Sequence, residues 1–266
     1  MRFWEARVQM EAMMMTRERF YAEWKRLFSE FLKKEGLRGQ AVSVTCRSLS
    51  PEEAIGQTKR KDFPILTGKE EMIQAEVDGA KGQAFTSAPV AFSGTLEQLL
   101  DIDMVHDAGG RSMCIAALNA VMRAKGLCRS TVHCRKDGPE QCACDMRSFL
   151  DERYPDYKRV VLVGYQPALL EMLAKTGRSV QVLDLNPANI GQIRYGVPVE
   201  DGVSSYPDAV SWADLILCTG STVCNGSIVQ YLNLPVDVVF YGTTLAGTAI
   251  LMHLNRVCFA DRYEEE

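Results

Sequence analysis

The sequence has no apolar run that approaches the roughly 20 residues needed to cross a bilayer, which argues against a membrane-spanning helix. Its N-terminus, MRFWEARVQMEAMMMTRERF, lacks a clean apolar core and a small-residue cleavage site, so no signal peptide is expected. The formal net charge of -4 argues against a broad nucleic-acid surface. Internal repeats and low-complexity tracts are also missing. We therefore expect a cytoplasmic protein with neither a membrane nor a nucleic acid as partner, and homo-oligomerisation stays open.

Cysteine is the residue type that stands out in this composition. Nine cysteines occur in 266 residues, an odd number, and in the cytoplasm they are expected to be thiols or metal ligands rather than a disulfide framework. The other residues, with 47% hydrophobic and 24% charged side chains, have the mix of an ordinary globular protein. A chain of this length can bury a substantial core and form one large or two modest domains.

Residues 1–105 are expected to form a small α+β domain. Residues 4–35 contain no Pro or Gly and carry apolar side chains at three- and four-residue steps, which predicts one long N-terminal helix or two joined ones. An alternating strand at 40–48, a hairpin over 70–89 and a helix at 94–102 follow. Alternation of strand, helix and strand does not occur in this part of the sequence.

Residues 158–266 have a different pattern, in which continuous apolar runs alternate with helical segments. This order predicts a Rossmann-like parallel sheet with right-handed crossovers. Residues 106–157, between the two parts, contain a helix at 111–126 and a Cys-rich segment. The predicted strands of the last part lie at 158–164, 179–187, 212–222 and 235–244, and its helices at 167–177 and 225–234.

The carboxyl ends of these predicted strands carry glycines and small polar residues. Ligands of open parallel sheets bind at this edge, where glycine permits close backbone approach and helix N-termini favour an anion. Asp184 follows Gly164 by twenty residues, so its carboxylate could bond a ribose hydroxyl, yet the G-x-G-x-x-G motif is absent. The same residues also suit ordinary turns and helix caps. The predicted ligand residues at this edge are Gly164, Tyr165, Asp184, Asn186, Gly220, Ser221, Thr222, Asn225, Gly242, Thr243 and Thr244.

Arg111 is a further candidate for this ligand site. It stands in HDAGGRSMC, where two glycines and a serine precede a helix and could hold an anion together with the guanidinium. A glycine hinge with a serine cap explains the same pattern without a ligand.

The segment CRSTVHCRKDGPEQCAC gathers four cysteines and one histidine within a polar stretch that cannot build a core. Thiolate and imidazole ligands select zinc, copper(I) or iron–sulfur clusters, and chelation would organise such a loop. However, the C-x2-C pairs of structural zinc sites and the spacings of ferredoxins are absent. A redox-active thiol pair or unremarkable thiols are the alternatives. The predicted metal ligands are Cys128, His133, Cys134, Cys142 and Cys144.

With these motifs the chain resembles an uncharacterised heavy-metal chelation family. The resemblance is carried by GRSMCIAALNAV, VVLVGYQPALLEMLAKTGRSVQVLDLNP, ADLILCTGSTVCNGSI and VVFYGTTLAG, which cover most of residues 105–250. It implies an enolase-N-terminal-like α+β domain before a Rossmann-like domain, with a metal or an anionic cofactor bound in the crevice between them. The Cys-rich segment and the long N-terminal helix have no counterpart in the family pattern.

Three functions are compatible with these observations. The first is a metal- or cluster-binding protein with a small anionic-ligand site in the inter-domain crevice. The second is an enzyme that uses a nucleotide-type cofactor such as NAD or S-adenosylmethionine, and the third is a thiol redox-sensing interaction protein. The sequence presents no convincing nucleophile, base and orienting group, so it predicts no particular reaction.

Overall fold

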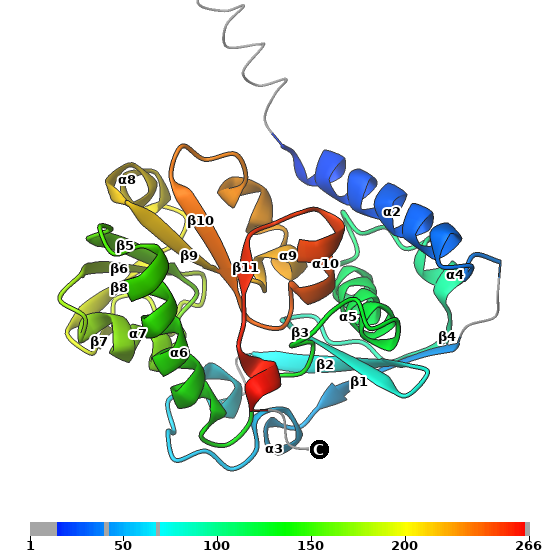
Figure 1. Ribbon diagram of the computed structural model, residues 1–266, viewed down its shortest axis with the longest axis horizontal. Helices are drawn as coiled ribbons and strands as arrows, with labels where there is room; N and C mark the ends of the chain where they lie inside the picture. The colour runs from blue at the N-terminus through cyan, green and yellow to red at the C-terminus, as the bar shows by residue number, and fades with distance from the viewer. Residues whose placement is uncertain (1–14, 40–42, 68–69, 264–266) are drawn as a thin grey trace, which may run out of the picture.

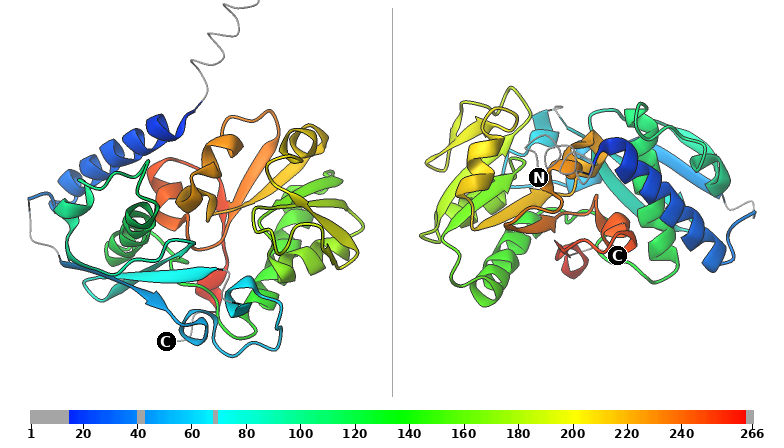
Figure 2. Two further views of the ribbon diagram at one scale, coloured as in Figure 1. Left: turned by 180° about the vertical axis from the view of Figure 1, so that it is seen from behind. Right: turned by 90° about the horizontal axis from the view of Figure 1, so that it is seen from above.

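The structure is a computed structural model that describes residues 15–39, 43–67 and 70–263. These residues form a four-stranded antiparallel sheet and a seven-stranded, mostly parallel sheet (Figure 1). Figure 2, seen from above, places the parallel sheet and its helices on one side of the molecule and α2, α5 and the antiparallel sheet on the other. The predicted α/β class, with a smaller α+β part before a Rossmann-like sheet, is confirmed.

The N-terminal helix α2 spans Arg17–Lys34 and begins at Thr16, whose side chain accepts a hydrogen bond from the Arg19 backbone N–H. Its apolar stripe, with Trp24 and Phe28 fully buried, packs toward α5 and α10. The long helix predicted over 4–35 is therefore confirmed for these residues, and its part at 4–14 lies outside the described residues.

The antiparallel sheet has the order β3-β2-β1-β4, and the predicted hairpin forms its first two strands. Helix α5 covers this sheet so closely that a Cβ at Gly82 would lie 2.3 Å from the Ala116 carbonyl oxygen. Glycine is therefore required where the helix crosses β3. The elements are β1 (Ser43–Leu49), α3 (Pro51–Ile55), η1 (Pro64–Thr67), β2 (Glu71–Val77), β3 (Ala80–Thr86), β4 (Phe92–Thr95), α4 (Leu96–Leu99) and α5 (Ala108–Ala124).

The parallel sheet has the order β11-β10-β9-β5-β6-β8-β7, in which only β7 runs antiparallel to its neighbour. The four predicted apolar strands are β5, β6, β9 and β10. The elements are α6 (Gly138–Arg153), β5 (Arg159–Val163), α7 (Pro167–Ala174), β6 (Ser179–Asp184), β7 (Ile193–Arg194), β8 (Val197–Asp201), α8 (Tyr206–Trp212), β9 (Leu215–Thr219), α9 (Thr222–Asn225), η2 (Ser227–Tyr231), β10 (Asp237–Tyr241), α10 (Ala246–Leu251), β11 (Arg256–Val257) and η3 (Ala260–Arg262).

Both faces of the parallel sheet are covered, which explains why its strands are apolar throughout. Val161 and Val163 of β5 face a core that also contains α2, α5 and α10 side chains. Val160 and Leu162, which alternate with them, face α6 and α7. The first core contains residues from both the N-terminal and the C-terminal part of the chain, so the two sheets are packed through shared side chains.

Three local predictions are wrong. The glycines and the serine of HDAGGRSMC do not precede a helix but lie within α5, which begins at Ala108 and is capped by Asp107. The helix expected over 225–234 is divided into α9 and η2, because Gly226 adopts a left-handed φ of 81° and ends α9.

The Cys-rich segment is not a loop throughout: from Gly138 it forms helix α6, with Pro139 in its first turn. Met146 and Leu150 of this helix are buried against the parallel sheet, so the segment does contribute to a core.

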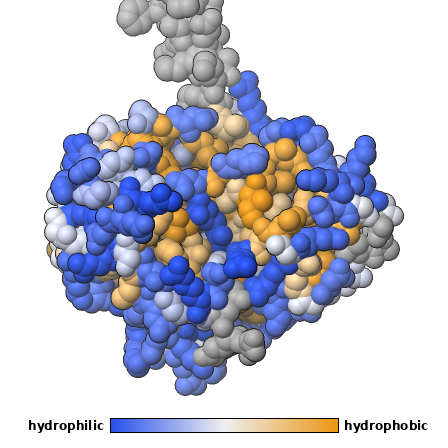
Figure 3. Space-filling model, in the orientation of Figure 1, coloured by the Kyte–Doolittle hydropathy of each residue, from blue (hydrophilic) through white to orange (hydrophobic). Residues whose placement is uncertain are grey.

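No helix among the described residues is long and apolar enough to span a membrane. On the face shown in Figure 3, hydrophilic side chains cover most of the surface and an apolar patch lies over α10, where Ile250 is 44% exposed.

Candidate functional site

A crevice lies at the carboxyl edge of the parallel sheet. From β5 the chain continues to β6 on one side and later returns to β9 on the other, which is the position where open α/β sheets bind ligands. Two adjoining cavities of about 500 Å³ and about 130 Å³ occupy it. Both reach the antiparallel sheet, and they share five lining residues: Glu70, Phe85, Gly164, Thr219 and Ser221.

All twelve ligand residues predicted from the sequence line one or both of these cavities. Whether they bind a ligand stays a prediction, but the chain segments that carry them meet in one place. The larger cavity is lined by Arg111, Gly164, Asp184, Asn186, Ser221, Thr222 and Asn225, and the smaller by Tyr165, Gly220, Gly242, Thr243 and Thr244.

Glycine at the ends of β5 and β9 is required by close packing. Gly164 has a φ of 84°, and a Cβ there would lie 2.7 Å from Cγ2 of Thr219. A Cβ at Gly220 would lie 2.8 Å from Cβ of Leu245. These glycines keep the crevice open between neighbouring strand ends.

Asp184, at the end of β6, is already engaged by the backbone. Its Oδ2 accepts a hydrogen bond from the Tyr165 N–H and its Oδ1 accepts one from the Asn186 N–H, both at 2.6 Å. The carboxylate thereby fixes the turn after β5 and the turn after β6 relative to each other. Each oxygen keeps a lone-pair direction for a ligand, so a bond to a ribose hydroxyl stays a prediction.

Glu70 is a site residue that the sequence did not reveal. It precedes β2 and lines both cavities, partly buried, without a hydrogen-bond or ion-pair partner among the described residues. Burial, and then the nearby negative charge of Asp184, raise the pKa of the Glu70 carboxyl from 4.5 to about 7. Such a carboxyl can take up or release a proton near neutral pH.

Arg111 is 5% exposed and lines only the larger cavity. Its guanidinium donates to the carbonyl oxygens of Cys224 at 2.7 Å and Met104 at 2.6 Å, and it lies over the ring of Tyr21. No carboxylate of the described residues forms an ion pair with it. These carbonyls accept hydrogen bonds from Nε and Nη1 but, among the described residues, no anion balances the positive charge.

Three cysteines meet at the smaller cavity: Cys134, Cys142 and Cys258. A hydrogen bond between the thiols of Cys134 and Cys142, together with burial, raises the pKa of Cys134 well above its ordinary value. Cys258, which has no ligand context in the sequence, is close enough to raise it further. Thr243 adds a buried hydroxyl to the same wall, without a hydrogen-bond partner among the described residues.

His133 also lines the smaller cavity, and its hydrogen bond fixes the tautomer of its imidazole ring. Its Nδ1 lies 2.6 Å from the Cys134 carbonyl oxygen, so Nδ1 carries the proton and donates it. Burial lowers the pKa of the imidazole, and its ring packs edge-on against Phe85. Burial therefore favours the neutral ring, in which Nε2 is an acceptor with no hydrogen-bond partner among the described residues.

The other two predicted metal ligands lie apart from these sulfurs. Cys128 is 5% exposed within the core that contains α5, and burial raises its pKa to about 11. Cys144 is exposed and stands two residues after Cys142 on α6, which turns it to another side of the helix. Within the described ranges, no group of three or more His, Cys, Asp or Glu side chains is placed to hold a metal ion.

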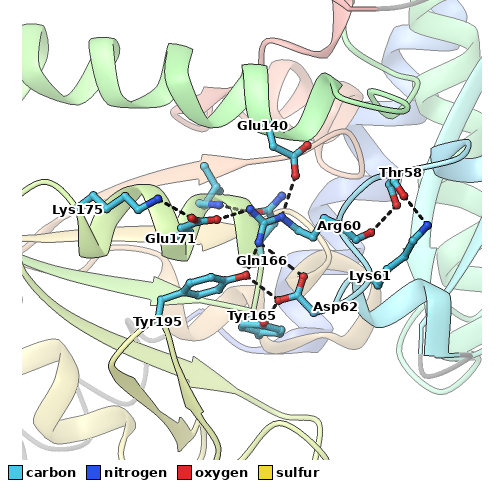
Figure 4. A network of polar contacts seen from close by, with 11 residues as sticks. Thr58, Arg60, Lys61, Asp62, Glu140, Tyr165, Gln166, Glu171, Lys175 and Tyr195 are labelled. Atoms are coloured by element: carbon cyan, nitrogen blue, oxygen red, sulfur yellow. Dashed lines mark hydrogen bonds and ion pairs between the residues drawn. The ribbon is translucent and has the colours of Figure 1, made fainter.

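A polar network closes the crevice beside the smaller cavity (Figure 4). Arg60, from the segment between α3 and η1, bonds Glu140 of α6 at 2.8 Å and also Glu171 of α7. Asp62 accepts hydrogen bonds from the hydroxyls of Tyr165 at 3.0 Å and Tyr195 at 2.7 Å. A short stretch of the N-terminal part is thus fixed onto the helices and strand ends of the parallel sheet.

The solved structures that this chain resembles include two proteins of unknown function from the DUF364 family. One, from Pyrococcus horikoshii, has 16% sequence identity and a TM-score of 0.47, with 82% of this chain and 79% of that chain covered. The other, from Desulfitobacterium hafniense DCB-2, has 12% identity and a TM-score of 0.46, with coverage of 68% and 71%. No curated protein matches the chain.

Comparison with family models adds an assignment by sequence. The match covers residues 149–254, from the end of α6 to the segment after α10. It includes β5, β6, β9 and β10, whose carboxyl ends line the crevice, whereas the cysteines at 134 and 142 precede it. Over residues 149–254 this chain matches the DUF364 family, described as "Putative heavy-metal chelation", and the resemblance inferred from the sequence is thus confirmed for that segment.

Proposed function

We propose that this protein binds one soft heavy-metal ion through the thiols of Cys134 and Cys142. The observation that carries the proposal is that Cys134, Cys142 and Cys258 line the same cavity, with Cys142 near enough to raise the pKa of the Cys134 thiol. Thiolates select soft ions, and ions such as Cu(I) and Hg(II) accept two sulfurs in a linear arrangement. The family description of residues 149–254 points to the same class of ligand.

The donor set favours a single ion over zinc or an iron–sulfur cluster. Structural zinc sites use four ligands, and the common clusters use four cysteines. The described residues place three thiols, those of Cys134, Cys142 and Cys258, in the wall of one cavity. Because burial and the mutual hydrogen bond keep Cys134 protonated, metal uptake must release a proton and is expected to strengthen as the pH rises. A reducing cytoplasm, where thiols stay free, suits this function.

The test is a titration of the reduced full-length protein with Cu(I) in competition with a chelator of known affinity. We expect one tightly bound ion in the wild type and at least a hundredfold weaker binding in Cys134→Ser and Cys142→Ser. Cys144→Ser is the matched control, since Cys144 is an exposed thiol on the same helix. Equal affinity of the wild type and the Cys134→Ser/Cys142→Ser variant would reject the proposal.

The same two thiols allow the redox alternative to be distinguished. Mild oxidant would join Cys134 and Cys142 in a disulfide, detected as the loss of two hydrogens in the intact mass and reversed by dithiothreitol. A reversible disulfide in a protein that binds no Cu(I) would favour the redox-sensing function. Tight Cu(I) binding would favour chelation, whether or not the disulfide also forms.

A second candidate function is the binding of a small anionic or nucleotide-type ligand in the larger cavity. The specific observation that favours it is the buried guanidinium of Arg111, which has no carboxylate partner among the described residues. A ligand that binds the folded protein raises its melting temperature, so nucleotides, NAD and S-adenosylmethionine can be compared by thermal shift. No shift with any of these compounds would reject a nucleotide-type ligand, and a shift that survives Asp184→Ala would reject a role for that residue.

A further inference from the structure

The larger cavity has a positively charged wall. Arg111 reaches it from α5, and Ala108, the first residue of that helix, lines the same wall. The carboxylate of Asp107 caps the N-terminus of this helix and accepts a hydrogen bond from the Gly110 N–H, so the guanidinium of Arg111 is the positive group of this wall. An anionic group bound here would supply the counter-ion that Arg111 lacks within the described residues.

A different part of the same cavity is negatively charged. Glu70 and Asp184 both line it, and their mutual repulsion contributes to the raised pKa of Glu70. No lysine or arginine pairs with either carboxyl within the part of the chain that the structure describes. Glu70 also lines the smaller cavity, which Arg111 does not reach, so Glu70 lies toward that side of the crevice.

We propose that the larger cavity binds a zwitterionic, amino-acid-type molecule, with its anionic group on Arg111 and its ammonium group between Glu70 and Asp184. This inference rests on the second candidate function above, that the cavity is a small-ligand site, and it names the ligand class. A purely anionic ligand would leave the two carboxyls unmatched, and a purely cationic ligand would leave Arg111 unmatched. A molecule that carries both charges complements both parts, and about 500 Å³ is large enough for a side chain in addition.

The polar residues between the charged groups support this class of ligand. Ser221 and Thr222 follow β9, and Asn225 ends the short helix after it, all in the wall of the larger cavity. Hydroxyl and amide groups can donate to a carboxylate or accept from an ammonium group. Because they are neutral, they do not favour either end of a zwitterion over the other.

The test uses the twenty standard L-amino acids and S-adenosylmethionine as probes, with isothermal titration calorimetry of the full-length protein. For the probe that binds best, the N-acetyl derivative removes the ammonium charge and the methyl ester removes the carboxylate. Each loses a charge-assisted interaction, so at least tenfold weaker binding is expected for both. Glu70→Gln should weaken the zwitterion at least tenfold but leave the affinity for its N-acetyl derivative unchanged or higher.

Glu71→Gln is the matched control, because Glu71 is the exposed neighbour of Glu70 in β2 and should bind the probe like the wild type. Zwitterions that bind no better than their N-acetyl derivatives would overturn the inference while leaving an anionic ligand in place. Failure of all probes and derivatives, with S-adenosylmethionine and inorganic phosphate included, would overturn both. The comparison of derivatives uses the wild type alone, so it remains decisive even where Glu70→Gln does not fold.

Discussion

Replacing Glu70 with glutamine should stabilise the protein at alkaline pH and change little at acidic pH. The folded state raises the pKa of this carboxyl from 4.5 to about 7, so it binds a proton more tightly than the unfolded chain does. The free energy of unfolding therefore falls as the pH rises from about 4.5 to about 7, and the full penalty is present above pH 7. Each pKa unit corresponds to about 1.4 kcal/mol, which gives about 3 kcal/mol as the upper estimate of that penalty.

Glu70→Gln keeps the size of the side chain and removes the charge. Urea unfolding followed by circular dichroism is expected to give similar stabilities for the variant and the wild type at pH 5. At pH 8 the variant should be more stable by up to about 3 kcal/mol. Glu71→Gln, at an exposed position, should show neither effect. A stability difference that is equal at both pH values, or absent at pH 8, would refute the assignment of Glu70 as a carboxyl that the fold leaves without a partner.

Three further predictions concern the walls of the crevice. Gly164→Ala should destabilise the protein by about 2 kcal/mol or more in urea unfolding, because φ is 84° and the new Cβ would lie 2.7 Å from another side chain. Arg60→Ala should lower the free energy of unfolding by about 2 kcal/mol in the same assay, because its guanidinium is 15% exposed and bonds two carboxylates. Lys59→Ala is the control, since the Lys59 side chain is 87% exposed and its loss should lower the free energy of unfolding by less than about 0.5 kcal/mol. The wild type should lose stability as the pH falls below 6.5, because the folded state lowers the pKa of the His133 imidazole and the unfolded chain takes up the proton. His133→Gln should reduce this loss. A similar pH dependence of the free energy of unfolding in variant and wild type would contradict the prediction.

The parallel sheet could be predicted from the sequence because its signals are local. Strands such as Arg159–Val163 and Leu215–Thr219 are apolar on both faces, and each is followed by a glycine at the carboxyl edge. Parallel pairing then brings those edges together without any further information. For this reason the eleven predicted ligand residues at these edges all line the crevice, although they come from four separate strand ends, and Arg111 joins them from α5.

Glu70 could not be found in this way. It is a single acidic residue before a strand of the other sheet, and its neighbourhood in the sequence contains no motif. Its importance arises from packing: the fold places it in the same cavity wall as Asp184, more than a hundred residues later in the chain, and partly buries it. The same holds for Cys258, which joins Cys134 and Cys142 only through the return of the chain at β11.

The sequence of helix α6 contains a typical helix start, but its cysteine content favoured the prediction of a loop. Gly138 and Pro139 are typical of a helix start, and Met146 and Leu150 lie four residues apart on one face. The concentration of cysteines favoured a metal-organised loop, although the helix can form without metal because its apolar face packs on the sheet. Helical geometry then decides which sulfurs meet, since Cys142 and Cys144 cannot face the same cavity.

The environment of each sulfur, rather than the number of cysteines, decides its chemistry. Burial alone, or burial as the main cause, raises the pKa of most of these thiols, and a buried thiol without a neighbouring donor behaves as a small apolar side chain. Two neighbouring thiols differ from an isolated one because both sulfurs can bind the same soft ion after losing their protons, which is the basis of the function proposed for Cys134 and Cys142. The nine-cysteine composition therefore reduces to one chemically distinct pair, and the thiols that serve packing are Cys46, Cys114, Cys128, Cys218 and Cys224.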